Sequence, residues 1–274
     1  MLEHTARIVE RSPRIMINPL VDDFDAEVRA FRAKRDGALS AKDGWLSTIG
    51  LVILEEGHNE LSFGTVTVTG DTVRVVASDG ARLTRSGEPI RERKLKPDQD
   101  EDVLQEGRVS HQLIRRGDTL AIRTRDPGSA LRQSFRGSEW FPANPLFRVS
   151  ARAVPLEHPR TRELTYSVAA KESVVVDYLL AFNWGGVMYS LEPIVEPKRL
   201  FVQFRDLTNG DATSEIGRYL YAPLPQQGRT VLDFNQALNP GCAYSPHVMW
   251  PVPPKRNMLY VHIDAGEKAP HRGP

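Results

Sequence analysis

The stretch that decides the fold is GRVSHQLIRRGDTLAIRTRD, residues 107–126. Two runs with apolar–polar alternation flank Gly117 and Asp118, a pair typical of a tight hairpin turn. Residues 65–84, TVTVTGDTVRVVASDGARLT, alternate in the same way, and the breaks TGDT and SDGA also predict hairpin turns. The pattern predicts antiparallel strands joined by short turns.

Further short, β-branched runs continue this pattern toward the C-terminus. They occupy residues 148–154, 161–168, 173–184, 187–195, 200–204, 218–222, 230–234 and 257–263. Turns recur at a spacing of roughly 8–12 residues, which favours sandwich or barrel sheets over βαβ units. We therefore predict an all-β protein, with antiparallel sandwich or barrel-like sheets in two packed halves and an N-terminal helical arm.

The N-terminal region differs from the rest. Residues 1–19 predict an irregular arm, packed on the body through Ile15, Met16 and Ile17. A helix is expected next, capped by Asp22 or Asp23, because apolar residues then recur at helical spacing. Those apolar residues are Phe24, Val28 and Phe31.

We divide the chain into an arm with its helix (1–50), an N-terminal β-rich half (51–146) and a C-terminal β-rich half (147–274), which together could form one compact domain. The sequence FPANP at 141–145 marks the boundary between the halves. The apolar residues 45–57 are expected to seat the arm against the core. Residues 85–106 are mostly polar and predict a solvated loop, with a gating or docking loop as the alternative.

Composition narrows the class of protein. The 274 residues carry a net charge of +1, which gives no reason to expect nucleic acid or an anionic membrane as a partner. Cys242 is the only cysteine, so no intrachain disulfide can form. With no apolar run of signal-peptide or transmembrane length, we expect a cytoplasmic protein. Homo-oligomerisation is left open.

Motifs for several enzyme classes are missing. The sequence has no G-x-S-x-G elbow, dinucleotide-binding G-x-G-x-x-G, Walker loop or H-E-x-x-H, and its seven histidines are scattered. We predict neither a metal site nor a cofactor.

Several longer segments resemble the bacterial and archaeal family of unknown function 1684. They are residues 43–51, 114–126, 135–137, 141–151, 204–210, 217–221, 232–245 and the closing DAGEK at 264–268. The resemblance runs from about Phe31 to Lys268, nearly the full length, but implies no activity. Three positions depart from the family pattern, which identifies a divergent member: Ser214 and Leu238 stand where the pattern has Tyr, and Trp250 where it has Cys.

Arginines are the first candidates for ligand binding, because a guanidinium can hold a carboxylate or phosphate through two parallel hydrogen bonds. Arg123 and Arg125 alternate onto one strand face. The alternative is that Arg123 forms an ion pair with Asp126 or Asp206 inside the protein. The predicted substrate-binding residues are Arg123, Arg125, Arg132, Arg205, Arg218 and Trp250.

Acidic residues that end strands are the candidates for acid/base chemistry. Asp126, Asp206 and Asp233 each precede a turn, where a carboxylate can act as acid or base or simply cap the turn. Asp233 lies two residues from Asn235, an arrangement that can position water or a carbonyl. The predicted catalytic residues are Asp233, Asn235, Tyr244 and Asp206.

Two further residues have alternative roles. Cys242 is either a nucleophile near His247 or a small buried residue, and the second interpretation is favoured. His111 lies in an alternating strand and is more simply a packed histidine than a base.

Two functions fit these observations. The first is a cofactor-independent acid/base enzyme, of hydrolase, lyase or isomerase/cyclase type, acting on a small anionic or acylated metabolite. The second is a non-catalytic β module that binds a ligand or a protein. In either case we expect one pocket, between the halves or at one end of the C-terminal sheet, with a small anionic molecule as partner.

Overall fold

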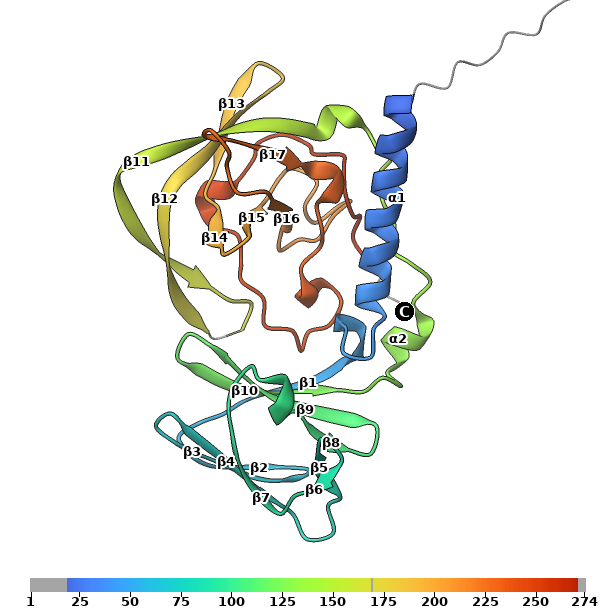
Figure 1. Ribbon diagram of the computed structural model, residues 1–274, viewed down its shortest axis with the longest axis vertical. Helices are drawn as coiled ribbons and strands as arrows, with labels where there is room; N and C mark the ends of the chain where they lie inside the picture. The colour runs from blue at the N-terminus through green and yellow to red at the C-terminus, as the bar shows by residue number, and fades with distance from the viewer. Residues whose placement is uncertain (1–18, 169, 271–274) are drawn as a thin grey trace, which may run out of the picture.

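Antiparallel pairing of short strands organises the chain. The computed structural model describes residues 19–168 and 170–270 (Figure 1). The expected hairpin at residues 107–126 is present: β9 (Val109–Arg116) pairs with β10 (Thr119–Arg125) across Gly117 and Asp118. It lies within a six-stranded sheet of order β1-β10-β9-β8-β5-β6. The other strands of that sheet are β1 (Thr48–Ile53), β5 (Leu83–Arg85), β6 (Glu88–Pro89) and β8 (Leu104–Glu106).

A second sheet completes the N-terminal half. It has the order β2-β3-β4-β7 and comprises β2 (Gly57–Leu61), β3 (Gly64–Thr69), β4 (Thr72–Ala77) and β7 (Glu92–Leu95). The two sheets share one core because alternate residues of each strand point the same way. Val66 and Val75 of this sheet pack in one buried cluster with Leu113 and Ile122 of the first sheet.

The C-terminal half contains a four-stranded sheet, β13-β12-β11-β17, and a three-stranded sheet, β14-β15-β16. The strands are β11 (Arg148–Thr165), β12 (Lys171–Trp184), β13 (Val187–Leu191), β14 (Ile194–Glu196), β15 (Arg199–Phe204), β16 (Arg218–Ala222) and β17 (Arg229–Asp233). Ala151, Leu180 and Leu232 of the first sheet pack with Val202 and Leu220 of the second.

Apolar packing and a buried ion pair join the C-terminal half to the N-terminal hairpin and to the long helix. Ile114 and Ala121 of the N-terminal hairpin pack against Leu164 and Met249 of the C-terminal half. The long helix α1 (Pro19–Leu39) runs along the C-terminal half (Figure 1), where Arg35 forms a buried ion pair of 3.2 Å with Glu267. The remaining helices are single turns: η1 (Trp45–Ser47), η2 (Asp100–Asp102), α2 (Ala130–Ser134), η3 (Pro145–Phe147), η4 (Phe234–Gln236), η5 (Gly241–Ala243) and η6 (Lys255–Asn257).

The predicted fold class is confirmed, with some corrections. The chain is all-β with antiparallel sheets and one long helix, in which Phe24 and Val28 are buried as expected. No sheet of residues 19–168 and 170–270 closes into a barrel, because each keeps two edge strands. Asp22 and Asp23 lie inside α1 rather than at its cap, because the helix begins at Pro19. The predicted arm contacts at residues 15–17 lie outside the described residues. That residues 51–146 and 147–274 are separate structural units remains a prediction.

Three local predictions were wrong. The turn at residues 78–81 joins strands of different sheets and is no hairpin. The polar stretch 85–106 contributes short strands, since β7 pairs with β4. Residues 257–263 make isolated backbone contacts beside β15 rather than a strand, and the carbonyl of Ile263 accepts a hydrogen bond from the buried Arg218 side chain (2.8 Å).

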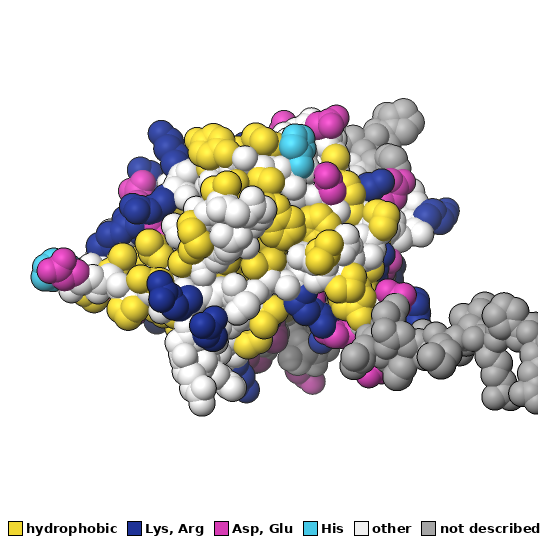
Figure 2. Space-filling view, turned by 90° about the horizontal axis from the view of Figure 1, so that it is seen from above, with side chains coloured by type: hydrophobic (Ala, Val, Ile, Leu, Met, Phe, Trp, Pro, Cys, Tyr) yellow, Lys and Arg dark blue, Asp and Glu magenta, His cyan; other side chains and the backbone are white. Residues whose placement is uncertain are grey.

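The surface carries interspersed charges. Figure 2 shows basic, acidic and apolar side chains mixed over the face seen from above, in keeping with the net charge of +1. Among the described residues, no helix is both long enough and apolar enough to cross a membrane.

Candidate functional site

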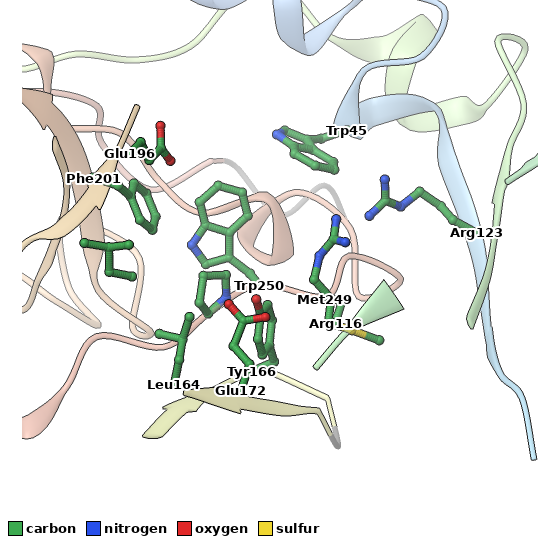
Figure 3. A pocket seen from close by; sticks show the side chains of 12 residues that line it. Trp45, Arg116, Arg123, Leu164, Tyr166, Glu172, Glu196, Phe201, Met249 and Trp250 are labelled. Carbon is green, nitrogen blue, oxygen red and sulfur yellow. The ribbon is translucent and has the colours of Figure 1, made fainter. Parts of the chain in front are cut away.

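A cleft of about 240 Å³ lies between the two β-rich halves (Figure 3). Residues from distant parts of the sequence line it: Trp45, Arg116, Arg123, Leu164, Tyr166, Glu172, Ile194, Glu196, Phe201, Met249, Trp250 and Pro251. Eight of these residues are apolar or aromatic and four are charged, a mixture that can hold a small molecule and fix its orientation.

The β9–β10 hairpin supplies the basic side of the cleft. Arg116 is the last residue of β9, and Arg123 lies within β10. Gly117 at the turn has a φ of +55°, and a Cβ there would lie 1.8 Å from the carbonyl oxygen of Lys171. Only glycine combines that conformation with such a close approach. The hairpin tip therefore sits directly on the start of β12, next to Glu172.

Arg123 is buried without an ionic partner. Its exposed fraction is 5%, its Nε has no hydrogen-bond partner, and none of the described residues forms an ion pair with it. The guanidinium lies over the Trp45 ring, with its carbon 5.6 Å from the ring centroid. Burial, together with Arg125 and Arg116, lowers the pKa of Arg123 to about 9, so the group is still charged at neutral pH. A buried, unpaired charge of this kind favours the binding of an anion.

Two other charged groups at the cleft are already paired. The Arg116 guanidinium lies 3.0 Å from the Asp98 carboxylate, and the Glu196 carboxylate lies 2.6 Å from Arg199. Glu172 differs, because its carboxylate accepts a hydrogen bond from the Tyr166 hydroxyl and has no cationic partner in residues 19–168 and 170–270. Burial and this carboxylate raise the pKa of Tyr166, so its hydroxyl remains a hydrogen-bond donor.

Trp250 is held firmly in the wall by other aromatic rings. Its ring centroid lies 5.9 Å from that of Trp45, 6.1 Å from that of Phe201 and 4.9 Å from that of Tyr219. Leu238 packs in the same cluster behind Trp250. Two of the three positions that depart from the family pattern thus shape this wall.

The predicted catalytic pair Asp233 and Asn235 lies elsewhere. Asp233 is directly opposite Arg148 in the β11–β17 pairing, and their side chains form an ion pair of 2.8 Å. Its other carboxylate oxygen accepts hydrogen bonds from the backbone and side chain of Asn235. Asn235 is fully buried and also bonds to the backbone of Asn144. These contacts hold β17 and η4 in place.

The predicted residues Asp206 and Arg218 form a second closed pair. The β15–β16 pairing brings the end of one strand to the start of the other, and their ion pair of 2.7 Å is completely buried. Asp206 also accepts hydrogen bonds from the backbone N–H and hydroxyl of Thr208. The alternative considered for Arg123 was wrong, because Asp206 pairs with Arg218 and Asp126 pairs with Arg108 at 2.8 Å.

The other candidates are likewise engaged away from the cleft. Arg125 donates to the Gln112 side chain at 3.0 Å, and Arg132 donates to the carbonyl of Ser40 at 2.7 Å. Arg205 is exposed and donates to a backbone carbonyl. Tyr244 is buried beneath Arg35. Burial raises the pKa of the Cys242 thiol to about 11, which disfavours the nucleophilic thiolate.

The family described as "Protein of unknown function (DUF1684)" matches residues 133–268. The chain belongs to the DUF1684 family. The match covers about half of the chain, so the nearly full-length extent expected from the sequence was overstated. No curated protein matches the chain.

One solved structure is similar in sequence to half of the chain. It is the solution NMR structure of the uncharacterized protein from gene locus rrnAC0354 of Haloarcula marismortui. The identity is 31% over 50% of this chain and 78% of that chain, with a TM-score of 0.42.

The cleft crosses the limit of the DUF1684 region. Trp45, Arg116 and Arg123 precede residue 133, whereas the opposite wall, including Glu172 and Trp250, lies within the matched region. The basic side of the cleft is therefore supplied by the half of the chain that the family match does not cover.

Two of the predicted site residues, Arg123 and Trp250, line the cleft, and the other residues that line it were not predicted as site residues. One feature of the sequence could have indicated Arg116: it directly precedes the Gly117–Asp118 turn, which places it at the tip of the hairpin. No feature of the sequence indicated Tyr166, Glu172 or Phe201, because the cleft forms only when the two halves pack together. The predicted functional roles of all these residues remain predictions.

Proposed function

We propose that this protein binds a small anionic metabolite in the cleft between its halves, with Arg123 as the group that holds the anion. One observation carries the proposal: Arg123 is 5% exposed and its guanidinium is charged, yet it has no ionic partner in the part of the chain that the structure describes. A bound carboxylate or phosphate would supply the missing counter-charge through two parallel hydrogen bonds.

The cleft wall supports a small ligand with an apolar or planar body. The volume of about 240 Å³ is below the range of about 300–1,000 Å³ that is usual for drug-sized ligands, which fits a small metabolite rather than a polymer. Trp45 and Trp250 stand nearly perpendicular, with an interplanar angle of 89°, and offer both a ring face and a ring edge to such a body.

A second candidate function is an acid/base enzyme at the same cleft. The observation that favours it is Glu172, a carboxylate that faces the cleft with the Tyr166 hydroxyl beside it. These two groups would replace Asp233 and Asn235, whose hydrogen-bonding atoms are taken by internal contacts. Either function suits a cytoplasmic protein, and neither requires a cofactor.

Thermal-shift titration tests the proposed function. Wild type, Arg123→Met and the control Arg205→Met, which removes an exposed arginine outside the cleft, are titrated with benzoate, succinate and phosphate. We expect at least one anion to raise the Tm of wild type and of Arg205→Met progressively, because a ligand that binds only the folded state stabilises it. Arg123→Met should not respond. Equal responses of all three proteins would refute the site.

The same samples separate binding from catalysis. NMR spectra of each bound anion and of its methyl ester, recorded before and after prolonged incubation, reveal turnover. Turnover that is lost in Glu172→Gln would favour the acid/base enzyme. Unchanged spectra with saturable binding would favour the binding module.

A further inference from the structure

The cleft presents two unpaired charges of opposite sign. Arg123 has no anionic partner and Glu172 has no cationic partner among residues 19–168 and 170–270, and the two do not pair with each other. Figure 3 shows them entering from different sides, Arg123 from β10 near Trp45 and Glu172 from β12 beside Tyr166 and below Trp250. The remaining charges of the cleft, Arg116 and Glu196, are neutralised by neighbours.

The environment of Glu172 suits a cation. Its carboxylate accepts one hydrogen bond from Tyr166 and keeps free acceptor positions, since an ionised carboxylate offers about four. The aromatic rings of Tyr166 and Trp250 lie near this carboxylate, and Phe201 packs against Trp250 on the side of Glu196. An ammonium group is attracted both to a carboxylate and to the faces of aromatic rings, most strongly to that of Trp. A purely anionic ligand would leave the negative charge of Glu172 without a partner.

From these two unpaired charges we infer that the ligand is zwitterionic: a small amino-acid-like molecule whose carboxylate binds Arg123 and whose ammonium group lies between Glu172 and the aromatic rings. The inference rests on the proposed function and adds to it the class of ligand. Leu164, Met249 and Pro251 also line the cleft and offer apolar surface to the carbon chain that joins the two charged ends.

The test compares ligands that differ only in their charged ends. Ligand-detected NMR titration gives the Kd of wild-type protein for γ-aminobutyrate, δ-aminovalerate and ε-aminocaproate, and for butyrate, valerate and caproate. Norvaline, an isomer of δ-aminovalerate with the two charges on adjacent positions, reports on the spacing of the site. Butylamine reports binding of the cation alone.

Two variants assign the effect to Glu172. Glu172→Gln removes the charge and keeps an acceptor for the Tyr166 hydroxyl. Glu163→Gln is the matched control, because Glu163 lies on the neighbouring strand outside the cleft, is exposed and pairs with Lys171 at 3.1 Å. Thermal unfolding of both variants verifies that they are folded.

We expect at least one amino acid to bind about tenfold more tightly than the carboxylate of the same chain length, a preference retained in Glu163→Gln. In Glu172→Gln the preference should vanish while carboxylate affinity stays unchanged. Equal binding of amino acids and carboxylates to wild type, or a preference that survives in Glu172→Gln, would overturn the inference and leave the anion site intact. If Arg123→Met bound every probe as wild type does, the proposed function itself would fail.

Discussion

Replacing Arg123 by methionine should make the protein more stable and abolish its ligand binding. Most buried side chains stabilise the fold that they occupy. Arg123 differs because its charge is buried with no ionic partner among residues 19–168 and 170–270. Burying that charge costs free energy in the folded chain that the unfolded chain does not lose. Methionine keeps most of the side-chain volume and the contact with Trp45 while removing the charge.

The size of the expected stability change follows from the environment of the Arg123 guanidinium. Burial and the neighbouring arginines lower the pKa of Arg123 to about 9. At about 1.4 kcal/mol for each pH unit of lowering, the charged group destabilises the fold by on the order of 5 kcal/mol at neutral pH. Methionine loses the cation–π contact with Trp45, which is about 1–2 kcal/mol. We therefore expect the free energy of unfolding to rise by about 3–4 kcal/mol, and the Tm by several degrees.

Urea unfolding at pH 7 measures the change, with Arg116→Met as the control. Arg116 also lines the cleft but is paired with Asp98 near the surface, so its loss should lower stability by less than about 1 kcal/mol. The two variants should thus shift stability in opposite directions. A less stable Arg123→Met protein would refute the reasoning, since it would mean that the charge is compensated within the fold.

Three further outcomes follow from the structure. Asp206→Asn removes the partner of the fully buried Arg218 and should lower the free energy of unfolding by about 3–5 kcal/mol in urea; a loss below about 1 kcal/mol would contradict the buried pair. Gly117→Ala, at a φ of +55° and against the Lys171 carbonyl, should cost at least about 2 kcal/mol by thermal unfolding and weaken ligand binding; an unchanged Tm would contradict the close approach. Burial lowers the pKa of His111 to about 4, so the unfolded chain takes up a proton below pH 6.5 that the folded chain does not. Stability should therefore fall by about 2 kcal/mol between pH 7 and pH 5 in wild type, and His111→Phe should remove that part of the pH dependence.

The strands were predictable because their physical basis is local. Alternation and a Gly-Asp pair are sufficient to specify the β9–β10 hairpin, and the structure has the expected register there. Residues 257–263 are an exception, because local alternation predicted a strand there that the structure does not have. They alternate like a strand, but they make only isolated backbone contacts, and the carbonyl of Ile263 accepts a hydrogen bond from the side chain of Arg218, a partner from another part of the chain that no local pattern reveals.

The candidate site was less predictable, for a related reason. Polar residues at strand ends indicated a pocket, but antiparallel pairing brings Asp206 to Arg218 and Asp233 to Arg148, so these charges neutralise each other. The cleft instead uses residues whose position depends on how the halves pack. Arg123 could be chosen as a candidate from the sequence because arginine side chains commonly bind anions. That it is buried in the cleft without an ionic partner among the described residues could be seen only in three dimensions.

The most direct test of the central claim is the NMR signal of the Arg123 side-chain Nε–H group. Its resonance can be assigned by its absence from the spectrum of Arg123→Met and followed during titration with benzoate and, separately, with the neutral benzamide. We expect a saturable shift of this resonance with benzoate and none with benzamide, because only the carboxylate supplies the counter-charge. A resonance that stays in place with benzoate, with δ-aminovalerate and with phosphate would contradict the claim that Arg123 is an anion-binding group.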